Sequence, residues 1–585
     1  MNIRKGVAAL LALLLALPAW GMATTSGNRP AINRSIASNN ARSLANLPET
    51  ARGRTDTLVI GVPDLYGETN PFWVKTMGDH YLASLLYDEL LFQSNSGEMG
   101  AGVAAFEVSQ DRHTVAFTVQ SGVCYADDGE PVTSDDFINA LYLLLTPGYD
   151  GVYDIARASI RGVEAYLSGE ADAIVGVARL SDRAFSVTLD VPNPEKLIFL
   201  AIPALRVSLF GDMRRPETLT EPEDFPAFYE ETLERVRSAD AAAMAYGQYC
   251  FMSMEPGEKA TLAAHEAYWR GKPNIGGVEL LVIPTDPSIA LMSMLEGTVD
   301  IISVLGSVDL VSDAFDTGFI NLYTWEGDVL GYLGMDIESA LFSDPSIREA
   351  LAIGIDRAEL ERRTLERYAV LPTALVFDSF GLDTDILTEA YPYDPDRAAD
   401  LLESAGWAIE EDGMRHRNGL LFSFTLTYNT PNPFMDKAAY RIQEDYAALG
   451  IEAELRAVPL EELIELVEAG ACDMYFQARK LPSSAALSAD LFVGDSRLNA
   501  SGYTSDVLTR DLTRATEEAD PARQTVLYEG LFLELYAELP IIPLYRRSEM
   551  LLVSGRILNA VVTTAHDITS DVYRFFLVDS LEKRW

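Results

Sequence analysis

Residues 106–141 read FEVSQDRHTVAFTVQSGVCYADDGEPVTSDDFINAL, and this stretch sets the pattern for the chain. The run HTVAFTV (113–119) places Val, Phe and Val on one face, which predicts a half-buried strand. The polar turn SQDR that precedes it is typical of a hairpin. Thr133, with Asp136 three residues later, resembles a capping box and predicts the start of a helix. We therefore expect a hairpin that leads into a helix.

The same alternation of strands and helices continues on both sides of this stretch. TLVIGVP (57–63) has the character of a buried strand, and LPIIPLYRR (539–547) is a second extended apolar run. Asp344-Pro345 and Asp394-Pro395 each place a capping Asp before a Pro in the first helical turn. Strands that alternate with helices indicate α/β domains. A chain of 585 residues is too long for one ordinary core, so we expect at least two domains.

Composition and charge narrow the classes of function. Hydrophobic residues make up 48% of the chain and charged residues 23%, which is typical of a globular protein. The formal net charge of -43 creates a negative field around the molecule. Such a field disfavours nucleic acid and anionic membrane surfaces as partners.

The N-terminus has the features of a secretory signal. MNIRK is positively charged, VAALLALLLALPAW is an apolar run too short to span a bilayer comfortably, and small residues follow it. We expect residues 1–23 to be a signal peptide, with a retained membrane anchor as the alternative. No Cys lies near the cleavage site, so the usual lipid-anchor signal is missing. Residues 24–56 are rich in Ser, Asn and Ala, which predicts a flexible linker. The mature protein is expected in the periplasm or outside the cell.

The motifs of catalysis and cofactor binding are missing from the sequence. The five histidines are scattered, His265-Glu266 is not followed by the second His of a zinc helix, and no nucleophile elbow or P-loop occurs. Residues 100–105 match G-x-G-x-x-A but do not lie between a strand and a long helix. We expect no catalytic residue, no metal site and no cofactor. The chain has three cysteines, Cys124, Cys250 and Cys472. Two of them could form one disulfide, or all three could be small residues of the core.

Six segments together resemble the extracellular solute-binding protein family 5, the peptide-, dipeptide- and nickel-binding subunits of ABC importers. Residues 106–141 are similar to the family's hairpin and "G-x-P-x-T-x-x-D" turn. AYGQYCFMSMEPGEKATLAAHEAYWRGKP resembles its "G-x-G-P-Y … N-x-x-Y-W" block. The other matches follow in the family's order: LEGTVDII, DPSIREALAIGIDRAEL, YDPDRAADLLESAGW and LPIIPLY. One such match alone is weak, but six in order are specific.

The resemblance implies an α/β, two-lobed periplasmic-binding-protein-like fold of type II and large cluster C type, with an extra β-rich subdomain. By that pattern residues 57–330 and 546–585 form lobe I, with the β-rich subdomain at 95–185. Residues 331–545 form lobe II. The lobes are expected to close around a peptide or peptide-like solute, and an ABC permease would recognise the closed form of this monomer. A sensor or surface module of the same fold is the alternative, and a secreted hydrolase is a third.

The family's ligand positions lead to YFQARKLPSSA, residues 475–485. Peptide-binding members carry "W-x-A-D-Y" where this chain reads FQARK, so the acid that anchors a peptide's amino group is absent. We expect Arg479 and Lys480 to hold a ligand carboxylate or another anion. The alternative is that both project into solvent and balance the glutamates of the preceding helix. The family pattern adds further candidates for ligand binding: Met77, Gly78, Asp79, Tyr153, Trp325 and Gln477.

Overall fold

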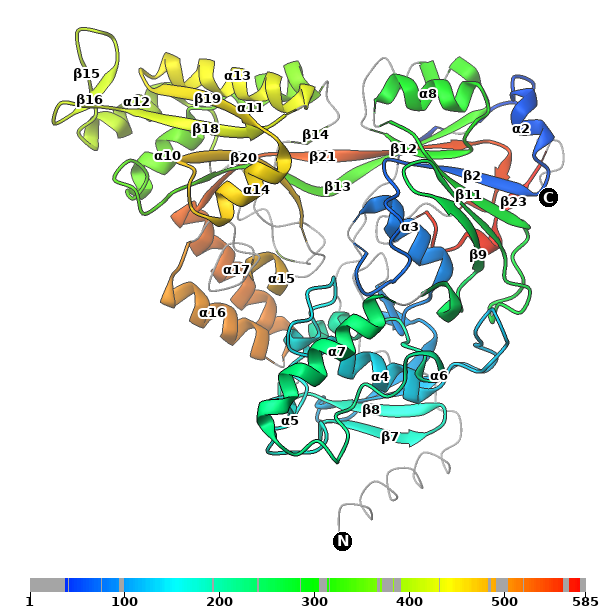
Figure 1. Cartoon of the computed structure of the whole chain (residues 1–585). Coiled ribbons are helices and arrows are strands. Elements are labelled where there is room, and N and C mark those ends of the chain that lie inside the picture. Colours follow the sequence, from blue (N-terminus) through cyan, green and yellow to red (C-terminus); the bar gives the residue numbers. More distant parts are fainter. Residues whose placement is uncertain are drawn as a thin grey trace. The chain divides into compact units, whose positions relative to one another are not determined.

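Two long antiparallel strands, β13 (Ile320–Met335) and β21 (Ile541–Ser554), run through a 12-stranded sheet in this computed structural model (Figure 1). Beyond β21 the sheet continues through β12 (Ile301–Val304), β2 (Thr57–Val62), β11 (Gly277–Val282), β10 (Lys259–Ala264) and β9 (Tyr249–Glu255). Beyond β13 it continues through β20 (Met474–Lys480), β18 (Ser423–Asn429) and β19 (Glu452–Val458). Chain segments from both ends of the sequence therefore share one sheet.

The structure describes most of the chain between residues 37 and 578. The described residues are 37–39, 41–74, 76–93, 99–191, 194–238, 241–284, 286–304, 313–314, 316–365, 369–370, 382, 391–430, 432–481, 485–490, 503–518, 520–560 and 568–578. The expected signal peptide, residues 1–23, lies outside them. Among these residues we find no helix with the length and apolar character of a membrane span.

The pairing of β13 with β21 is regular over its first block, and its register shifts twice farther along β13. Residues 320–326 pair with 548–554, and residues 330–334 pair with 541–546. The register shifts between Glu326 and Leu330 and again between Gly331 and Tyr332. An irregular ladder bends and twists the strands locally. The two blocks of this ribbon therefore meet at a local break in the strand pairing.

The buried apolar residues form separate clusters at the two ends of this ribbon. The first draws on residues 58–301 and 551–575, and a smaller one beside it on 44–322 and 550–552. Two others draw on residues 330–545. Each cluster packs helices against the sheet, among them α3 (Met77–Leu86), α8 (Pro287–Leu295), α10 (Pro345–Ile353), α12 (Pro395–Ser404), α13 (Pro433–Ala448), α14 (Leu460–Glu468), α16 (Asp506–Glu517) and α17 (Pro521–Glu538).

The stretch at 106–141 folds as its sequence predicts. The four-stranded sheet runs β5 (Ala104–Val108), β6 (Thr114–Val119), β8 (Ala184–Thr188) and β7 (Val177–Ser181). The helix α4 (Ser134–Leu144) begins at a capping box formed by Thr133 and Asp136. It packs on the sheet through Phe137, whose ring stacks on Phe185 with centroids 6.1 Å apart. The hairpin and helix predicted here are confirmed.

Part of the segment expected to be a flexible linker is folded instead, so that expectation was wrong for residues 41–56. Residues 49–53 form α2 (Glu49–Gly53), and the preceding β1 (Ala37–Asn39) pairs with β13. The side chains of Leu44, Leu47 and Ala51 are buried in the smaller cluster. These few apolar residues are too sparse to create a periodic pattern, so their burial could not be predicted from local periodicity.

The cysteine readings are also settled. The helix α3 ends at Leu86, and β3 (Leu91–Gln93) follows it. All three cysteines are free thiols, so of the two readings left open the disulfide is excluded. Cys472 is buried and the other two are half-buried. They serve as small packing residues, as free cysteines commonly do.

Candidate functional site

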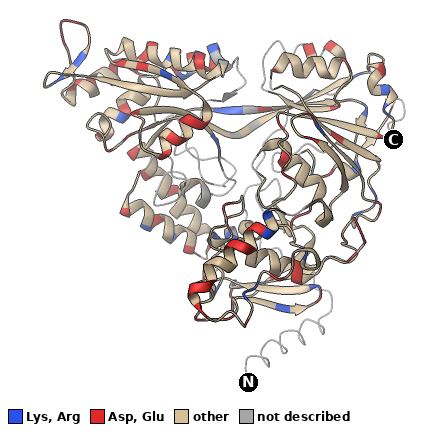
Figure 2. Cartoon of the chain, viewed as in Figure 1, with Lys and Arg blue, Asp and Glu red and all other residues tan. Residues whose placement is uncertain are grey.

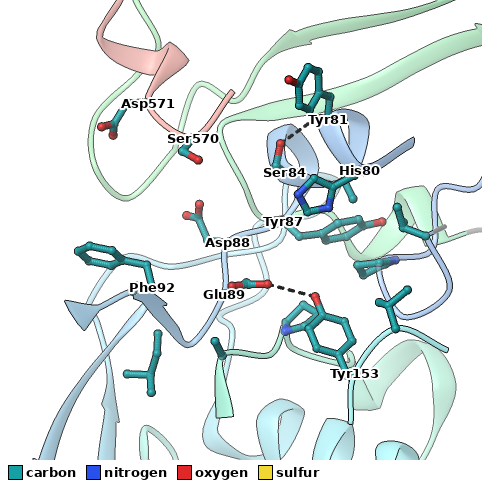
Figure 3. A pocket seen from close by; sticks show the side chains of 18 of the residues that line it. His80, Tyr81, Ser84, Tyr87, Asp88, Glu89, Phe92, Tyr153, Ser570 and Asp571 are labelled. Atoms are coloured by element: carbon teal, nitrogen blue, oxygen red, sulfur yellow. Dashed lines mark hydrogen bonds between the residues drawn. The ribbon is translucent and has the colours of Figure 1, made fainter. Parts of the chain in front are cut away.

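A cavity of about 1160 Å³ opens beside α3 (Figure 3). Its walls come from residues 71–102, 152–153, 198–203 and 570–574, with Arg270 and Lys480. Parts of the chain that lie hundreds of residues apart in sequence therefore meet around it. A large concave site with apolar, aromatic and a few charged residues is the usual form of a ligand-binding site.

The helix α3 supplies one wall of the cavity. Met77, His80, Tyr81 and Ser84 all line it, and their spacing places them on one helical face. The helix begins at Thr76, whose hydroxyl accepts a hydrogen bond from the Asp79 amide at 3.4 Å. The start of the helix thus fixes the direction in which this face points.

Close backbone packing sets the position of the first turn of α3. The amide of Gly78 donates a hydrogen bond to Asp64 Oδ1 at 2.9 Å. A Cβ atom on residue 78 would lie 1.7 Å from the carbonyl oxygen of Asp64, which is far inside van der Waals contact. Only glycine allows this approach. Gly78 therefore allows the first turn of α3 to pack directly against Asp64, in the segment that follows β2.

Two adjacent carboxylates lie where α3 runs into β3, and they point in different directions (Figure 3). The carboxylate of Asp88 accepts hydrogen bonds from Trp269 Nε1 at 2.7 Å and from the Tyr268 hydroxyl at 3.0 Å. Burial raises the pKa of Asp88, although the Arg270 charge and these donors oppose the shift. The Asp88 carboxylate is therefore held by hydrogen bonds to these two side chains.

Glu89, by contrast, has an exposed side chain in the cavity. Its Oε1 accepts a hydrogen bond from the Tyr153 hydroxyl at 3.2 Å. Burial holds the pKa of Tyr153 well above its usual value, and the charge of Glu89 adds to the shift. The Tyr153 hydroxyl therefore stays protonated at neutral pH and orients the Glu89 carboxylate.

Five of the eight predicted site residues fall into two groups. Met77, Tyr153 and Lys480 line the cavity. Gly78 and Asp79 support it from behind, because Gly78 contacts Asp64 and the Asp79 side chain is buried. The Asp79 carboxylate accepts hydrogen bonds from the amides of residues 66 and 67, at 3.3 and 3.0 Å, and from the Thr76 hydroxyl.

The strand β20 separates the two cations that the sequence places together. Successive residues of a strand point to opposite faces. Lys480 lies among the lining residues of the cavity, whereas Arg479 is on the other face with Gln477. On that face Gln477 Oε1 accepts a hydrogen bond from Tyr332 at 2.7 Å. Burial raises the pKa of Tyr332 to about 12, and the nearby Arg479 charge opposes the shift.

Trp325 lies on β13, opposite Glu549 of β21, and packs half-buried against the first cluster. It does not appear among the residues that line this cavity.

Four parts of the cavity wall were not predicted from the sequence: Asp88, Glu89, Arg270 and the segment at 570–574. Acidic pairs are common at helix ends, and nothing local in the sequence shows that residues 88–89 meet a segment almost 500 residues away. No group of three or more His, Cys, Asp or Glu side chains suited to a metal ion occurs among the described residues.

Comparison with known proteins agrees with the geometry. The family model "Bacterial extracellular solute-binding proteins, family 5 Middle" matches residues 98–486. The dipeptide-binding protein DppE of Bacillus subtilis is 25% identical over 452 residues, which cover 75% of this chain and 77% of DppE. The oligopeptide-binding protein AppA of Bacillus subtilis is 26% identical over 223 residues, which cover 37% of this chain and 40% of AppA.

Solved structures share the fold. AppA of Bacillus subtilis in complex with a nonapeptide superimposes with a TM-score of 0.68 at 17% identity, covering 90% of this chain and 99% of AppA. NikA of Brucella suis in complex with Fe(III)-EDTA gives a TM-score of 0.73 at 17% identity, covering 89% of this chain and all of NikA. The expected fold class is confirmed. The chain belongs to the bacterial extracellular solute-binding proteins of family 5.

Proposed function

We propose that this protein is the solute-binding receptor of an ABC importer and captures a peptide or peptide-like solute between two hinged lobes. The observation that carries the proposal is the cavity beside α3. Most of its wall belongs to the elements around the first core cluster, and Lys480 enters it from β20. A ligand that contacts both walls would favour a closed form over an open one.

The ribbon of β13 and β21 supports a hinge between two lobes. The two strands connect the core clusters, and their pairing is irregular between residues 326 and 332. We place lobe I at 57–330 and 546–585, and lobe II at 331–545, so that the crossings fall in this region. A few residues at such a position can absorb the backbone rotation of a closing motion.

The size and lining of the cavity support a peptide-like ligand. A volume of about 1160 Å³ is at the upper end for a small-molecule site, so a solute several residues long fits. Relatives are named for dipeptides and oligopeptides. Lys480 supplies a cation for a ligand carboxylate, with Met77 and Tyr153 as further contacts. We place the mature protein in the periplasm or outside the cell, where it would work with a membrane permease.

A binding module that serves sensing instead of transport is the second candidate. It is favoured by Arg479, which replaces the acid expected of a peptide-binding member at this position. Neighbouring genes for a permease and an ATPase would support transport, and their absence would support sensing. Both candidates share the binding site and differ only in what recognises the closed form.

A thermal-shift panel tests the proposed binding. The purified mature chain is heated alone and with dipeptides, tripeptides, longer peptides and metal chelates. A ligand that binds only the native state must raise the melting temperature as its concentration increases. We expect a saturable increase with at least one peptide. If no peptide raises the melting temperature, or if a peptide is hydrolysed by the protein, the proposal is wrong.

A further inference from the structure

We propose that Gln248 is a positioning residue of the binding site, because it holds residues 569–573 in place as part of the cavity wall. This inference rests on the proposed solute-binding function and names a determinant of affinity at the same cavity. Ser570 and Asp571 of this segment line the cavity (Figure 3). Gln248 is not among the lining residues, so it acts on a solute through the segment that it holds.

The side-chain amide of Gln248 makes three hydrogen bonds to the backbone of this segment, which we call the Gln248 clamp. Its Nε2 donates to the carbonyl oxygens of Thr569 and Ser570, at 2.9 and 3.0 Å. Its Oε1 accepts a hydrogen bond from the Tyr573 amide at 2.9 Å. Both N–H donors of the amide are therefore used. Gln248 is only 1% exposed, so water does not compete for these bonds.

The backbone at Gln248 is itself anchored to α3. The Gly247 amide donates a hydrogen bond to the carbonyl of Leu86, the last residue of α3, at 2.7 Å. The Gln248 carbonyl accepts a hydrogen bond from the His265 amide at 3.0 Å, and His265 Nδ1 lies 2.9 Å from the Gly247 carbonyl oxygen. Gln248 thus joins the helix that forms one wall of the cavity to the segment that forms another.

Two further contacts hold the ends of this segment separately. The buried Thr569 hydroxyl lies 2.6 Å from the hydroxyl of Ser84, which lines the cavity on α3. The Asn274 side chain donates a hydrogen bond to the Tyr573 carbonyl at 3.1 Å. Each of these contacts holds one end, whereas Gln248 holds both. Without Gln248, the residues between the two ends could move relative to the rest of the wall.

The identity of residue 248 distinguishes this chain from the motif that it resembles. In AYGQY (245–249), Gln248 stands in the place of the proline of "G-x-G-P-Y". A proline side chain has no hydrogen-bond donor or acceptor, so it could not form the clamp. The clamp therefore follows from the sequence of this chain and not from the resemblance.

A wall that is fixed in advance favours binding. A ligand that has to order a mobile segment loses part of its binding free energy to that ordering. Because the clamp fixes Ser570 and Asp571 beforehand, the solute meets an ordered surface. Loss of the clamp would also leave the carbonyls of residues 569 and 570 without their buried donor, which favours a displaced segment.

The test replaces Gln248 with Met, which is similar in size and cannot form the clamp. The replacement has to be neutral, because acidic residues are spread over helices and strands alike (Figure 2) in a chain of net charge -43. A further charge would alter the field that the solute meets. Gln248→Asn is the milder second variant, since it keeps the amide on a side chain too short to hold both ends. It decides the test if Gln248→Met does not fold.

Gln524→Met is the matched control. Gln524 is also buried, at 4% exposed, and its Nε2 donates a hydrogen bond to the Ala515 carbonyl at 3.1 Å. This bond joins α17 to α16, and Gln524 is not among the cavity-lining residues. Both Met variants lose a buried amide, so a general loss of stability should lower the melting temperature of both. A loss confined to the cavity wall should appear in the Gln248 variants alone.

Two measurements are made on each protein well below its melting temperature. Hydrogen–deuterium exchange without ligand reports on residues 568–578, and isothermal titration with trialanine reports on affinity. We expect Gln248→Met to exchange faster in this segment, because its amides open more often, and to bind trialanine roughly tenfold more weakly or worse. Gln248→Asn should lie between this variant and the wild type. Gln524→Met should match the wild type in both measurements, with faster exchange only in α16 and α17.

The outcomes separate the inference from the proposed function. Unchanged exchange of residues 568–578 in the Gln248 variants, or unchanged trialanine affinity, overturns the inference and leaves the proposed function standing. An equal loss of affinity in Gln524→Met also overturns it, because the effect would then be one of general stability. Faster exchange in Gln248→Met, together with no binding of trialanine by the wild type, supports the clamp and counts against the proposed peptide ligand.

Discussion

Arg556 and Asp300 lie 256 residues apart in the sequence and form a two-point ion pair in the core. The Nε–Oδ1 and Nη2–Oδ2 distances are 2.8 and 2.7 Å, and the two side chains are 3% and 0% exposed. Asp300 also accepts a hydrogen bond from the Val59 amide, and the Arg54 guanidinium lies 3.1 Å away. This pair therefore links the segment after β21 to β2, the strand that contains Val59.

Replacing Asp300 with Ala should therefore destabilise the protein strongly. The change leaves the buried Arg556 charge without its partner, and breaking a buried pair in this way costs about 3–5 kcal/mol. Urea unfolding curves give the free energy of unfolding. Asp190→Ala is the control, because its pair with Arg161 is exposed, and such pairs contribute about 0–1 kcal/mol. Equal losses in both variants would contradict the assignment of a buried ion pair.

Gly78→Ala should disturb the cavity through the backbone. The new methyl group would lie 1.7 Å from the Asp64 carbonyl oxygen, so the first turn of α3 has to shift. Overpacking of this kind costs about 1–3 kcal/mol. We expect a lower melting temperature and weaker ligand binding, since Met77, His80 and Tyr81 would move together.

Gly53→Ala is the matched control for this substitution. Gly53 ends α2, and an added Cβ would meet no atom within 4 Å. We expect unchanged binding and an unchanged or slightly increased stability, because Ala restricts the unfolded chain. A Gly78→Ala variant that binds ligand as wild type does would show that the start of α3 does not set the cavity.

Asp445 on α13 should make stability depend on pH. Burial raises its pKa from 3.8 to about 6, although its ion pair with Arg441 opposes the shift. Between these two values the folded state holds a proton that the unfolded state has lost. The stability that this group contributes is therefore fully present below pH 3.8 and is lost as the pH rises to about 6.

Asp445→Asn removes this titration. The difference in unfolding free energy between wild type and the variant should fall by up to about 3 kcal/mol across that pH range, at about 1.4 kcal/mol per pKa unit. Above pH 7 the difference should be constant. A difference that does not change between pH 4 and 7 would show that Asp445 titrates normally. Chemical unfolding of both proteins at a series of pH values measures this difference in unfolding free energy.

Lys480→Ala and Arg479→Ala should act differently, because the two side chains lie on opposite faces of β20. For trialanine, Lys480→Ala should lose about 1.5–3 kcal/mol, the range for hydrogen bonds to charged groups. The C-terminal amide of trialanine should bind wild type and Lys480→Ala equally. Arg479→Ala should keep the wild-type preference for the free carboxylate. Calorimetric titration with both probes separates these outcomes.

Much of the fold could be predicted from local patterns. Asp344 and Asp394 cap α10 and α12, and Thr133 caps α4, as the sequence indicated. These signals are local, since a cap needs only the residues of one helical turn. Family motifs then supplied the order of the elements. The burial of Leu44 and Leu47 could not be predicted, because it depends on a distant sheet.

The candidate site was only partly predictable for the same reason. Met77, Tyr153 and Lys480 were found through family positions, and the cavity includes them. Glu89 and Asp571 gave no signal, because they become neighbours of one cavity only after the C-terminal segment folds back. The sequence also paired Arg479 with Lys480, whereas strand geometry separates them.

The position of β21 in the sheet has a consequence for biogenesis. This strand lies between β13 and β12, yet it is synthesised after nearly all the others. A nascent chain released before residue 541 would lack the strand that joins the two groups of strands, and it would also lack Arg556. Neither half could then complete its sheet on the ribosome. The two groups of strands could therefore join into one sheet only after residues 541–554 had emerged.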